Sequence, residues 1–369
     1  MNLRERLWPK VPEEKWSDHR WQIANRLKGA KGLERLLRLE GLSPEPYLRL
    51  LSKYKWASTP YYVSLIKGPY SSDPIALQVL PSQEETRVQT PLSCPDPLSE
   101  HKYSPVPGLI HRYRDRVVIL VSNRCASYCR HCNRKRTWRK PESLPATNDA
   151  LNHVLNYIKT HPEIREVLIS GGDPLFLSLK RLKHILKSLK DVPNVEVLRI
   201  GTRIPVVLPM AVTKELCKTL KAFRPLWLNT QFNHPQEITL EAQKACERLQ
   251  LSGIPVSNQS VLLKGVNDDL NTMKSLCYDL QKIMVRPYYL FHCDFVEGTD
   301  HFRTSISCGI EIIEKMWGHT GGMCIPNYVV DLPGGLGKAR LMPSHLKKVE
   351  KDNLIFQTFE GKLMRLQID

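Results

Sequence analysis

Residues 117–132 read VVILVSNRCASYCRHC, an apolar run that leads directly into three closely spaced cysteines. The β-branched stretch Val117–Ser122 is typical of a buried strand. Cys125, Cys129 and Cys132 follow in one loop, at the carboxyl end of that strand. Loops at this end carry the active sites of parallel (β/α) folds. The stretch therefore predicts the first strand of a parallel sheet and places the chemistry beside it.

The alternation of strand and helix continues along the chain. Five further runs predict strands: Glu166–Ser170, Val195–Gly201, Leu226–Phe232, Val256–Leu262 and Arg286–Cys293. Amphipathic stretches separate them, at 148–160, 178–190, 213–222, 238–251 and 268–284. This regularity predicts βαβ units and a parallel sheet. Six units fall short of the eight in a complete barrel, so we expect an α/β fold with a partial (β/α)6 TIM-like barrel. A doubly wound sheet is the alternative, although no GxGxxG motif follows any strand.

The sequence divides into three regions. Residues 1–108 are expected to form a helical N-terminal region, followed from about residue 72 by a wrapping linker rich in Pro, Ser and Asp. Residues 109–319 form the partial barrel. Residues 320–369 form a C-terminal segment with strand-like stretches near Ile355 and Leu363.

The composition predicts a globular chain with a sizeable core: 369 residues, 41% hydrophobic and 25% charged. No run of eighteen or more apolar residues occurs, and the first residues lack the apolar stretch of a signal peptide. We therefore expect a cytoplasmic protein without a membrane partner. The formal charge of +17 would suit nucleic acid. Because Lys and Arg are spread along the whole chain, we expect a basic, solvated surface, with RNA contact as the alternative.

The three clustered cysteines predict a reactive iron–sulfur centre. Thiolates hold such clusters, and three ligands leave one iron of a [4Fe-4S] cluster open to another molecule. A zinc site with His131 as the fourth ligand, or chance clustering, is the alternative, but no second pair of ligands stands nearby. The other cysteines are scattered singly, and most of them are expected to be buried thiols: Cys94, Cys217, Cys246, Cys277, Cys293, Cys308 and Cys324.

A second candidate is the glycine-rich loop PGGLGK, which ends at Lys338. A phosphate-binding P-loop would need Gly in place of Leu332 and Ser or Thr in place of Ala339, so nucleotide hydrolysis is not expected. A lysine that binds pyridoxal phosphate and an ordinary surface loop both remain open from the loop alone.

The cysteine spacing CxxxCxxC after a first strand resembles the signature of the radical S-adenosylmethionine (SAM) superfamily. From about residue 7 to 361, the chain also resembles the lysine 2,3-aminomutase family. The matching segments are TPYYVSLI, SPVPGLIHRYRDRVV, CASYCRHCNRKR, SGGD, RIPVVLP, FNHPQEIT, NQSVLLKGVND, RPYYLFHCD, HFRT, GIEIIE and VVDLPGGLGK.

The resemblance implies three cofactors: a [4Fe-4S] cluster, SAM and pyridoxal 5′-phosphate. Cys125, Cys129 and Cys132 would bind the cluster, and SAM would chelate its open iron. Lys338 would form the internal aldimine as the catalytic lysine. The residues implied for SAM are Ser170, Gly171, Gly172 and Asp173, together with His131 and Gln259. Those implied for pyridoxal phosphate, besides Lys338, are Arg112, Tyr113 and Arg116, whose arginines suit a phosphate.

The implied reaction is the interconversion of free L-lysine and L-β-lysine by radical 1,2-amino migration, which makes the chain an isomerase. Arg134 would hold the α-carboxylate, and Asp294 and Asp331 would hold the ε-ammonium. Two carboxylates around one buried ammonium make physical sense. Arginine as substrate, or lysine destined for elongation factor P, are alternatives within the family. A radical SAM enzyme that modifies RNA is the alternative from another class. For His131 and Gln259, a structural role is as plausible as one in positioning SAM or the cluster. The same holds for Asn229 and His234, near the end of the fourth strand.

The chain departs from the family pattern at a structural zinc site. Fuller members bind this zinc with a Cys-rich segment beyond the position of Asp369, and Asp269 stands where the site takes a cysteine. We therefore expect the zinc to be absent. A homo-oligomer, a dimer at least, and an electron donor such as flavodoxin or ferredoxin are the partners that the resemblance implies.

Overall fold

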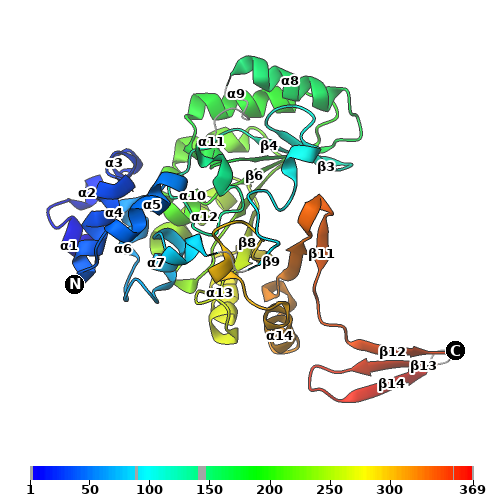
Figure 1. Cartoon of the computed structure of the whole chain (residues 1–369). Coiled ribbons are helices and arrows are strands. Elements are labelled where there is room, and N and C mark those ends of the chain that lie inside the picture. Colours follow the sequence, from blue (N-terminus) through cyan, green and yellow to red (C-terminus); the bar gives the residue numbers. More distant parts are fainter. Residues whose placement is uncertain (1–2, 88–89, 140–146, 352, 368–369) are drawn as a thin grey trace.

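The computed structural model describes residues 3–87, 90–139, 147–351 and 353–367. Its centre is a curved sheet in the order β11-β10-β9-β8-β7-β6-β5-β4-β3 (Figure 1). Strands β4 to β10 run parallel, and β3 and β11 pair antiparallel at the two edges. The strands are β3 Leu109–Tyr113, β4 Arg116–Leu120, β5 Glu166–Ser170, β6 Val197–Gly201, β7 Leu226–Thr230, β8 Val256–Leu262, β9 Arg286–His292, β10 Asn327–Asp331 and β11 Lys338–Arg340.

The predicted partial barrel is confirmed, since all six predicted strands form. The structure adds a seventh parallel strand, β10, in the segment that the sequence pattern assigned to the C-terminal tail. The apolar run of β10 is short, but the preceding helix α14 (Ile306–Met316) returns the chain to the sheet beside β9. This strand brings Asp331 to the same edge as the cysteine loop.

Helices cover the outer face of the sheet: α8 Asn148–Lys159, α9 Leu179–Lys190, α10 Ile204–Val207, α11 Lys214–Lys221, α12 Leu240–Leu251, α13 Leu270–Lys282 and α14 Ile306–Met316. Six of them begin at a side chain that accepts a hydrogen bond from the backbone, which satisfies an otherwise free N–H group. These N-caps are Thr147, Ser178, Thr213, Thr239, Asp269 and Ser305. Asp269 therefore has a structural role as a cap.

The N-terminal region packs short helices against one side of the barrel (Figure 1). They are α1 Leu3–Leu7, α2 Glu13–Trp16, α3 His19–Ala24, α4 Gly29–Leu37, α5 Glu45–Lys53, α6 Pro60–Ser64 and α7 Pro74–Val79, with the two-stranded sheet β1 Leu27–Lys28 and β2 Ala57–Ser58. Apolar side chains from these helices and from the barrel belong to one hydrophobic cluster. The boundaries at residues 108 and 319 stay a prediction.

The C-terminal segment ends in a three-stranded antiparallel sheet that extends away from the barrel (Figure 1). Its strands are β12 Leu346–Glu350, β13 Asn353–Gln357 and β14 Leu363–Gln367, so the strands predicted near Ile355 and Leu363 are confirmed. We call these residues, 346–367, the arm. In the described part of the chain, no helix is long and apolar enough to cross a membrane.

Candidate active site

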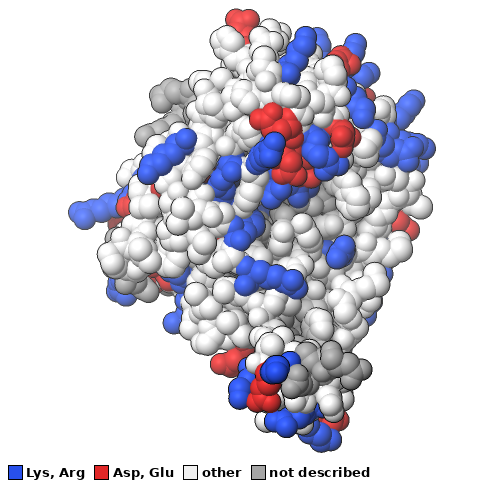
Figure 2. Space-filling model, turned by 90° about the vertical axis from the view of Figure 1, so that its right-hand side faces the viewer, with Lys and Arg blue, Asp and Glu red and all other residues white. Residues whose placement is uncertain are grey.

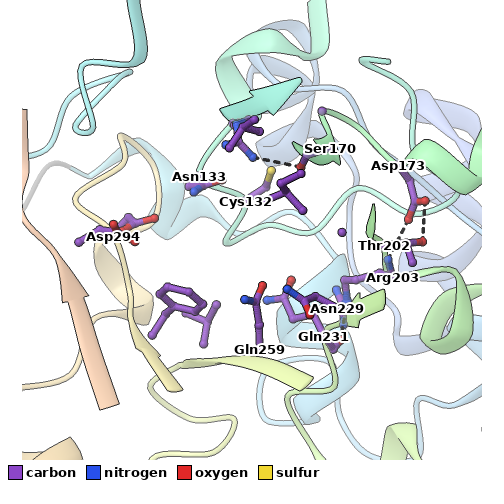
Figure 3. A pocket seen from close by; sticks show the side chains of 18 of the residues that line it. Cys132, Asn133, Ser170, Asp173, Thr202, Arg203, Asn229, Gln231, Gln259 and Asp294 are labelled. Carbon is purple, nitrogen blue, oxygen red and sulfur yellow. Dashed lines mark hydrogen bonds between the residues drawn. The ribbon is translucent and has the colours of Figure 1, made fainter. Parts of the chain in front are cut away.

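The carboxyl ends of the parallel strands surround a cavity of about 550 Å³. Apart from His234, the site residues named from the sequence line it, from the cysteine loop and the 170–173 turn to Lys338, although the segments lie more than 200 positions apart. Figure 3 shows Cys132, Asp173, Gln259 and Asp294 around this space. The structure thus brings the predicted residues together, while their individual roles stay predictions.

The cysteine loop is fixed from the N-terminal side. Arg26 donates a hydrogen bond to the backbone oxygen of Cys125 at 2.8 Å, and the N–H group of Tyr128 bonds to Ala57. Burial, followed by the charge of neighbouring Cys129, raises the pKa of the Cys132 thiol to about 11. A group with this pKa ionises readily only when a metal takes the place of its proton. Other buried thiols, such as Cys293, share this raised pKa, so the grouping of three thiols in one loop is what gives the chemistry of a cluster site.

The thiols fit a cluster better than a single zinc ion. Within the described residues, no three His, Cys, Asp or Glu side chains converge as the ligands of one ion do. Cluster ligands bind separate irons and stand further apart. His131, the fourth ligand of the alternative zinc site, directs Nε2 toward Gln231 and Asn233, at 3.2 and 3.3 Å.

The 170–173 turn packs tightly against the cysteine loop. A Cβ atom on Gly171, whose φ is +119°, would lie 2.4 Å from the backbone oxygen of Ser122, and one on Gly172 would lie 2.5 Å from that of Arg124. The glycines are thus needed for this close approach of two backbones. The carboxylate of Asp173 accepts bonds from Thr202 Oγ1 and the Arg203 N–H group, at 2.7 and 2.8 Å. Burial raises the pKa of Asp173 to about 6.

Arg134 reaches the cavity in a fixed orientation. Its Nη2 lies 2.7 Å from Oε1 of Glu100, and its Nη1 lies 3.5 Å from Ser170 Oγ. Arg136 also pairs with Glu100, at 2.6 Å. Although burial opposes ionisation, the two arginines lower the pKa of Glu100 below its usual value. Glu100 thereby holds one side of the Arg134 guanidinium and leaves Nη1 on the cavity side.

The end of the cavity beside β10 and β11 holds Lys338 and Asp331, which face each other across this strand pair. Oδ1 of Asp331 accepts from Lys338 Nζ at 3.0 Å and from Arg112 Nη2 at 3.2 Å. Arg112 and Arg116 both lie over the ring of Tyr113, 4.9 and 4.1 Å from its centroid. This end therefore combines a lysine amine with a concentration of positive charge.

Asp294 lies on the loop after β9, near Asp331 and Lys338 and also near Asn133 and Arg134. Burial, then the nearby charge of Asp331, raises its pKa to about 7, against a hydrogen bond from Asn133 that lowers it. Two carboxylates that repel each other in this way favour a cation between them.

Several polar atoms of the cavity wall are buried without a partner among the described residues: His131 Nδ1, Arg199 Nε, Asn229 Nδ2 and Thr230 Oγ1. Buried polar groups normally form hydrogen bonds, so these atoms fit polar ligands such as SAM or a phosphate. Asn229 thus joins the candidate ligand-binding residues. His234 instead accepts the N–H group of Gln236 as the cap of η7 Pro235–Glu237 and does not line the cavity.

Sequence patterns missed Glu100, Arg199 and Arg203, which all line the cavity. Glu100 stands in the irregular linker, where no periodicity marks it. Arg203 lies directly after β6 and begins the segment RIPVVLP, so its place at a strand end could have identified it.

Comparisons with known proteins agree with this geometry. A family model described as the radical SAM superfamily matches residues 119–276, and one described as lysine-2,3-aminomutase matches residues 313–366. The L-lysine 2,3-aminomutase of Fusobacterium nucleatum is 45% identical over 98% of this chain and 84% of that protein. The enzyme of the same name from Acetoanaerobium sticklandii is 45% identical over 98% of this chain and 87% of its own length. The glutamate 2,3-aminomutase of Clostridioides difficile is 40% identical, over 96% and 83% respectively.

Proposed function

The chain belongs to the lysine 2,3-aminomutase family of radical SAM isomerases, and from this premise we propose that it interconverts free L-lysine and L-β-lysine. One observation carries the choice of substrate. Asp331 already accepts a hydrogen bond from an alkylammonium group, that of Lys338, at 3.0 Å. A second buried carboxylate, Asp294, is close enough to repel Asp331, so a further cation between the two is favoured. The ε-ammonium of a substrate lysine has the same chemistry.

Three thiolates hold the iron–sulfur cluster in this proposal, and the atoms without partners on His131, Asn229 and Thr230 are available to form hydrogen bonds with SAM. When bound, the cluster and SAM supply a 5′-deoxyadenosyl radical that removes a hydrogen atom from the substrate and returns it. The 170–173 turn keeps the cysteine loop against β5. Gln259 faces the same space (Figure 3).

Pyridoxal phosphate is the third proposed cofactor, and it supplies a conjugated ring that delocalises an unpaired electron. Lys338 binds it through Nζ. Arg112 and Arg116 offer two guanidinium groups beside Tyr113, which matches the double charge of a phosphate. Arg199 contributes a buried N–H group without a partner.

Arg134 is proposed to bind the substrate α-carboxylate through the edge that Glu100 leaves free. A guanidinium binds a carboxylate through paired hydrogen bonds, so its orientation matters. Two aspartates in the same cavity disfavour glutamate, whose side chain is anionic. Arginine is the second candidate substrate, because a guanidinium, that of Arg112, also lies 3.2 Å from Asp331.

The partners are proposed from charge and from exposed apolar surface. Figure 2 shows Lys and Arg side chains on several sides of a hollow in one face, with a group of Asp and Glu side chains above it. The basic part of this surface suits an acidic electron donor of the flavodoxin or ferredoxin type. Exposed apolar residues on the arm, such as Val349 and Met364, support a homo-oligomer, a dimer at least.

The test is anaerobic incubation of the reconstituted protein with SAM, a reductant and, separately, lysine, arginine, ornithine and glutamate. Chromatography should show a β-amino acid from lysine as the main product. The variant Asp294→Ala should raise KM for lysine sharply while retaining the cluster. Faster conversion of arginine or glutamate, or unchanged turnover in Asp294→Ala, would contradict the substrate assignment.

A separate measurement distinguishes the proposal from RNA modification. Protein with bound pyridoxal phosphate should show a visible absorption band that borohydride abolishes, and Lys338→Ala should lack the borohydride-stable adduct. A protein that lacks this band and binds RNA would favour the alternative.

A further inference from the structure

The hydrogen bonds around the cysteine loop include one from a buried cation to a cysteine sulfur. Nη1 of Arg203 lies 2.7 Å from Sγ of Cys129. The Arg203 side chain is 9% exposed and stands at the end of β6. We propose that Arg203 tunes the iron–sulfur cluster: its hydrogen bond to the Cys129 thiolate raises the reduction potential and so favours entry of the electron that starts the reaction.

Hydrogen bonds to protein acceptors fix the orientation of the rest of the Arg203 guanidinium. Nε donates to the backbone oxygen of Gln231 at 3.1 Å. Nη2 faces three acceptors, the Tyr62 hydroxyl, Gln78 Oε1 and Glu237 Oε1, at 3.1, 3.1 and 2.7 Å. A guanidinium has five N–H groups, and these contacts leave at most one of them, on Nη1, for another ligand. Arg203 therefore donates to the Cys129 sulfur and has too few free N–H groups to bind the carboxylate of a ligand through two parallel hydrogen bonds.

The counter-charge of Glu237 lies on the far side of the guanidinium from the sulfur. Its Oε1 also accepts from the Tyr62 hydroxyl at 2.6 Å, and its Oε2 accepts from the N–H groups of Asn233 and His234, at 2.5 and 3.0 Å. These donors draw the carboxylate charge away from the cluster. The buried pair thus presents its positive end to Cys129, where weak screening makes the interaction strong.

Other cations near the loop are held differently. Arg130 donates to both oxygens of Glu85 and to the backbone oxygen of Lys55, and Lys135 donates to Glu85 and two backbone oxygens. Neither side chain donates to a thiol in the described residues. Arg26 and Arg134 also lie near the loop, but Arg26 donates to the backbone oxygen of Cys125 and Arg134 pairs with Glu100. Among these cations of the described chain, Arg203 is the one that donates a hydrogen bond to a cysteine sulfur.

The step is a one-electron transfer. A low-potential one-electron donor, dithionite in the test, is oxidised, and the cluster gains the electron and one unit of negative charge. Arg203 keeps its protons and supplies no bond. Net charge and hydrogen bonds to the sulfurs are established determinants of cluster potential, so a positive donor at Cys129 favours the reduced form.

The test is a redox titration of the reconstituted cluster without SAM, followed by the EPR signal of the reduced state. Arg203→Met should lower the ratio of reduced to oxidised cluster at a fixed potential by at least about tenfold, which is about 59 mV for one electron. Arg203→Lys, which keeps charge but not the planar fork, should fall between Met and wild type. Arg165→Lys is the matched control, because Arg165 pairs with Glu196 at the surface. Iron and sulfide content is measured for every variant.

Activity supplies a second readout. With a stronger reductant the turnover of Arg203→Met should recover toward wild type, as expected for a positioning residue that affects only the electron-transfer step. An unchanged reduction potential in Arg203→Met would overturn the proposal. If SAM binding is weakened at the same time, Arg203 binds SAM instead. Loss of iron from both Arg203 variants would also overturn it, because Arg203 would then support the loop rather than tune the cluster.

Discussion

Asp294 carries a carboxyl group whose surroundings oppose its ionisation. Burial, then Asp331, raises its pKa to about 7. Below that pH the group is neutral and loses its attraction for an ammonium, so binding of lysine should release a proton. We expect kcat/KM for lysine to fall as the pH drops below 7, approaching about tenfold per pH unit.

The pH profile of Asp294→Asn is the control. This variant should lose the acidic limb, because its amide does not titrate in this range. At pH 8 its kcat/KM should be lower by at least about thirtyfold, since removing one partner of a buried charge pair costs about 2 kcal/mol or more. An acidic limb that persists unchanged in Asp294→Asn would assign the titration to another group.

Gly335 lets the Lys338 loop pack against Tyr103, because glycine has only a hydrogen atom where other residues carry a Cβ atom. A Cβ atom there would lie 2.4 Å from the Tyr103 ring, whereas one on Gly334 meets nothing within 4 Å, and both glycines have φ near +75°. Each alanine variant carries the backbone penalty of about 1–2 kcal/mol, but only Gly335→Ala adds the clash. Gly335→Ala should therefore retain much less pyridoxal phosphate than Gly334→Ala, as measured by absorbance after gel filtration. Equal retention would show that the contact with Tyr103 does not position the loop.

At the scale of the elements, the linker helix η2 Gln83–Thr86 secures the cysteine loop through Glu85. This carboxylate is fully buried between Arg130 and Lys135, at 2.6 and 3.0 Å. Against the effect of burial, the two cations lower its pKa from 4.5 to about 2. The stabilisation is therefore present above about pH 4.5 and is lost as the pH falls toward 2.

Glu85→Gln should destabilise the protein by about 3–5 kcal/mol at pH 7, because two buried cations lose their counter-charge. Chemical denaturation of wild type and variant measures the difference, and it should shrink as the pH falls below 4.5. Glu84→Gln, at an exposed neighbour that pairs with Arg87, serves as the control. A small effect of Glu85→Gln at pH 7 would mean that water reaches the two cations.

The elements that the sequence predicted share a local signal. Strands such as Glu166–Ser170 alternate with amphipathic helices, and the cysteines stand together in one loop, so pattern and spacing were sufficient. Glu85 and Glu100 have no such pattern, because their partners lie 45 and 34 positions away and meet them only in the folded chain. β10 was missed as a barrel strand because its short apolar run is defined by pairing with β9.

For the whole molecule, the arm carries an apolar face that the chain itself leaves open. Cross-strand pairs place Leu346 opposite Phe356 and Met364, and Val349 opposite Leu354 and Leu366, on one face of its sheet. Val349 and Met364 are 67% and 54% exposed. A small sheet of this kind needs a covered apolar face for stability, and its edge strands favour association. A second copy of the chain, as proposed above, would supply that cover.

The prediction is that Met364→Lys together with Leu366→Lys lowers the assembly mass in light scattering at a given protein concentration. Each lysine introduces a charge into an interface that would otherwise be apolar, and the desolvation cost favours dissociation. Leu363→Lys is the matched control, because this exposed residue of β14 pairs with Gln357 and lies on the opposite face. If the control dissociates as readily as the double variant, the apolar face does not form the interface. If wild type is monomeric at micromolar concentration, the arm requires a partner other than a second copy.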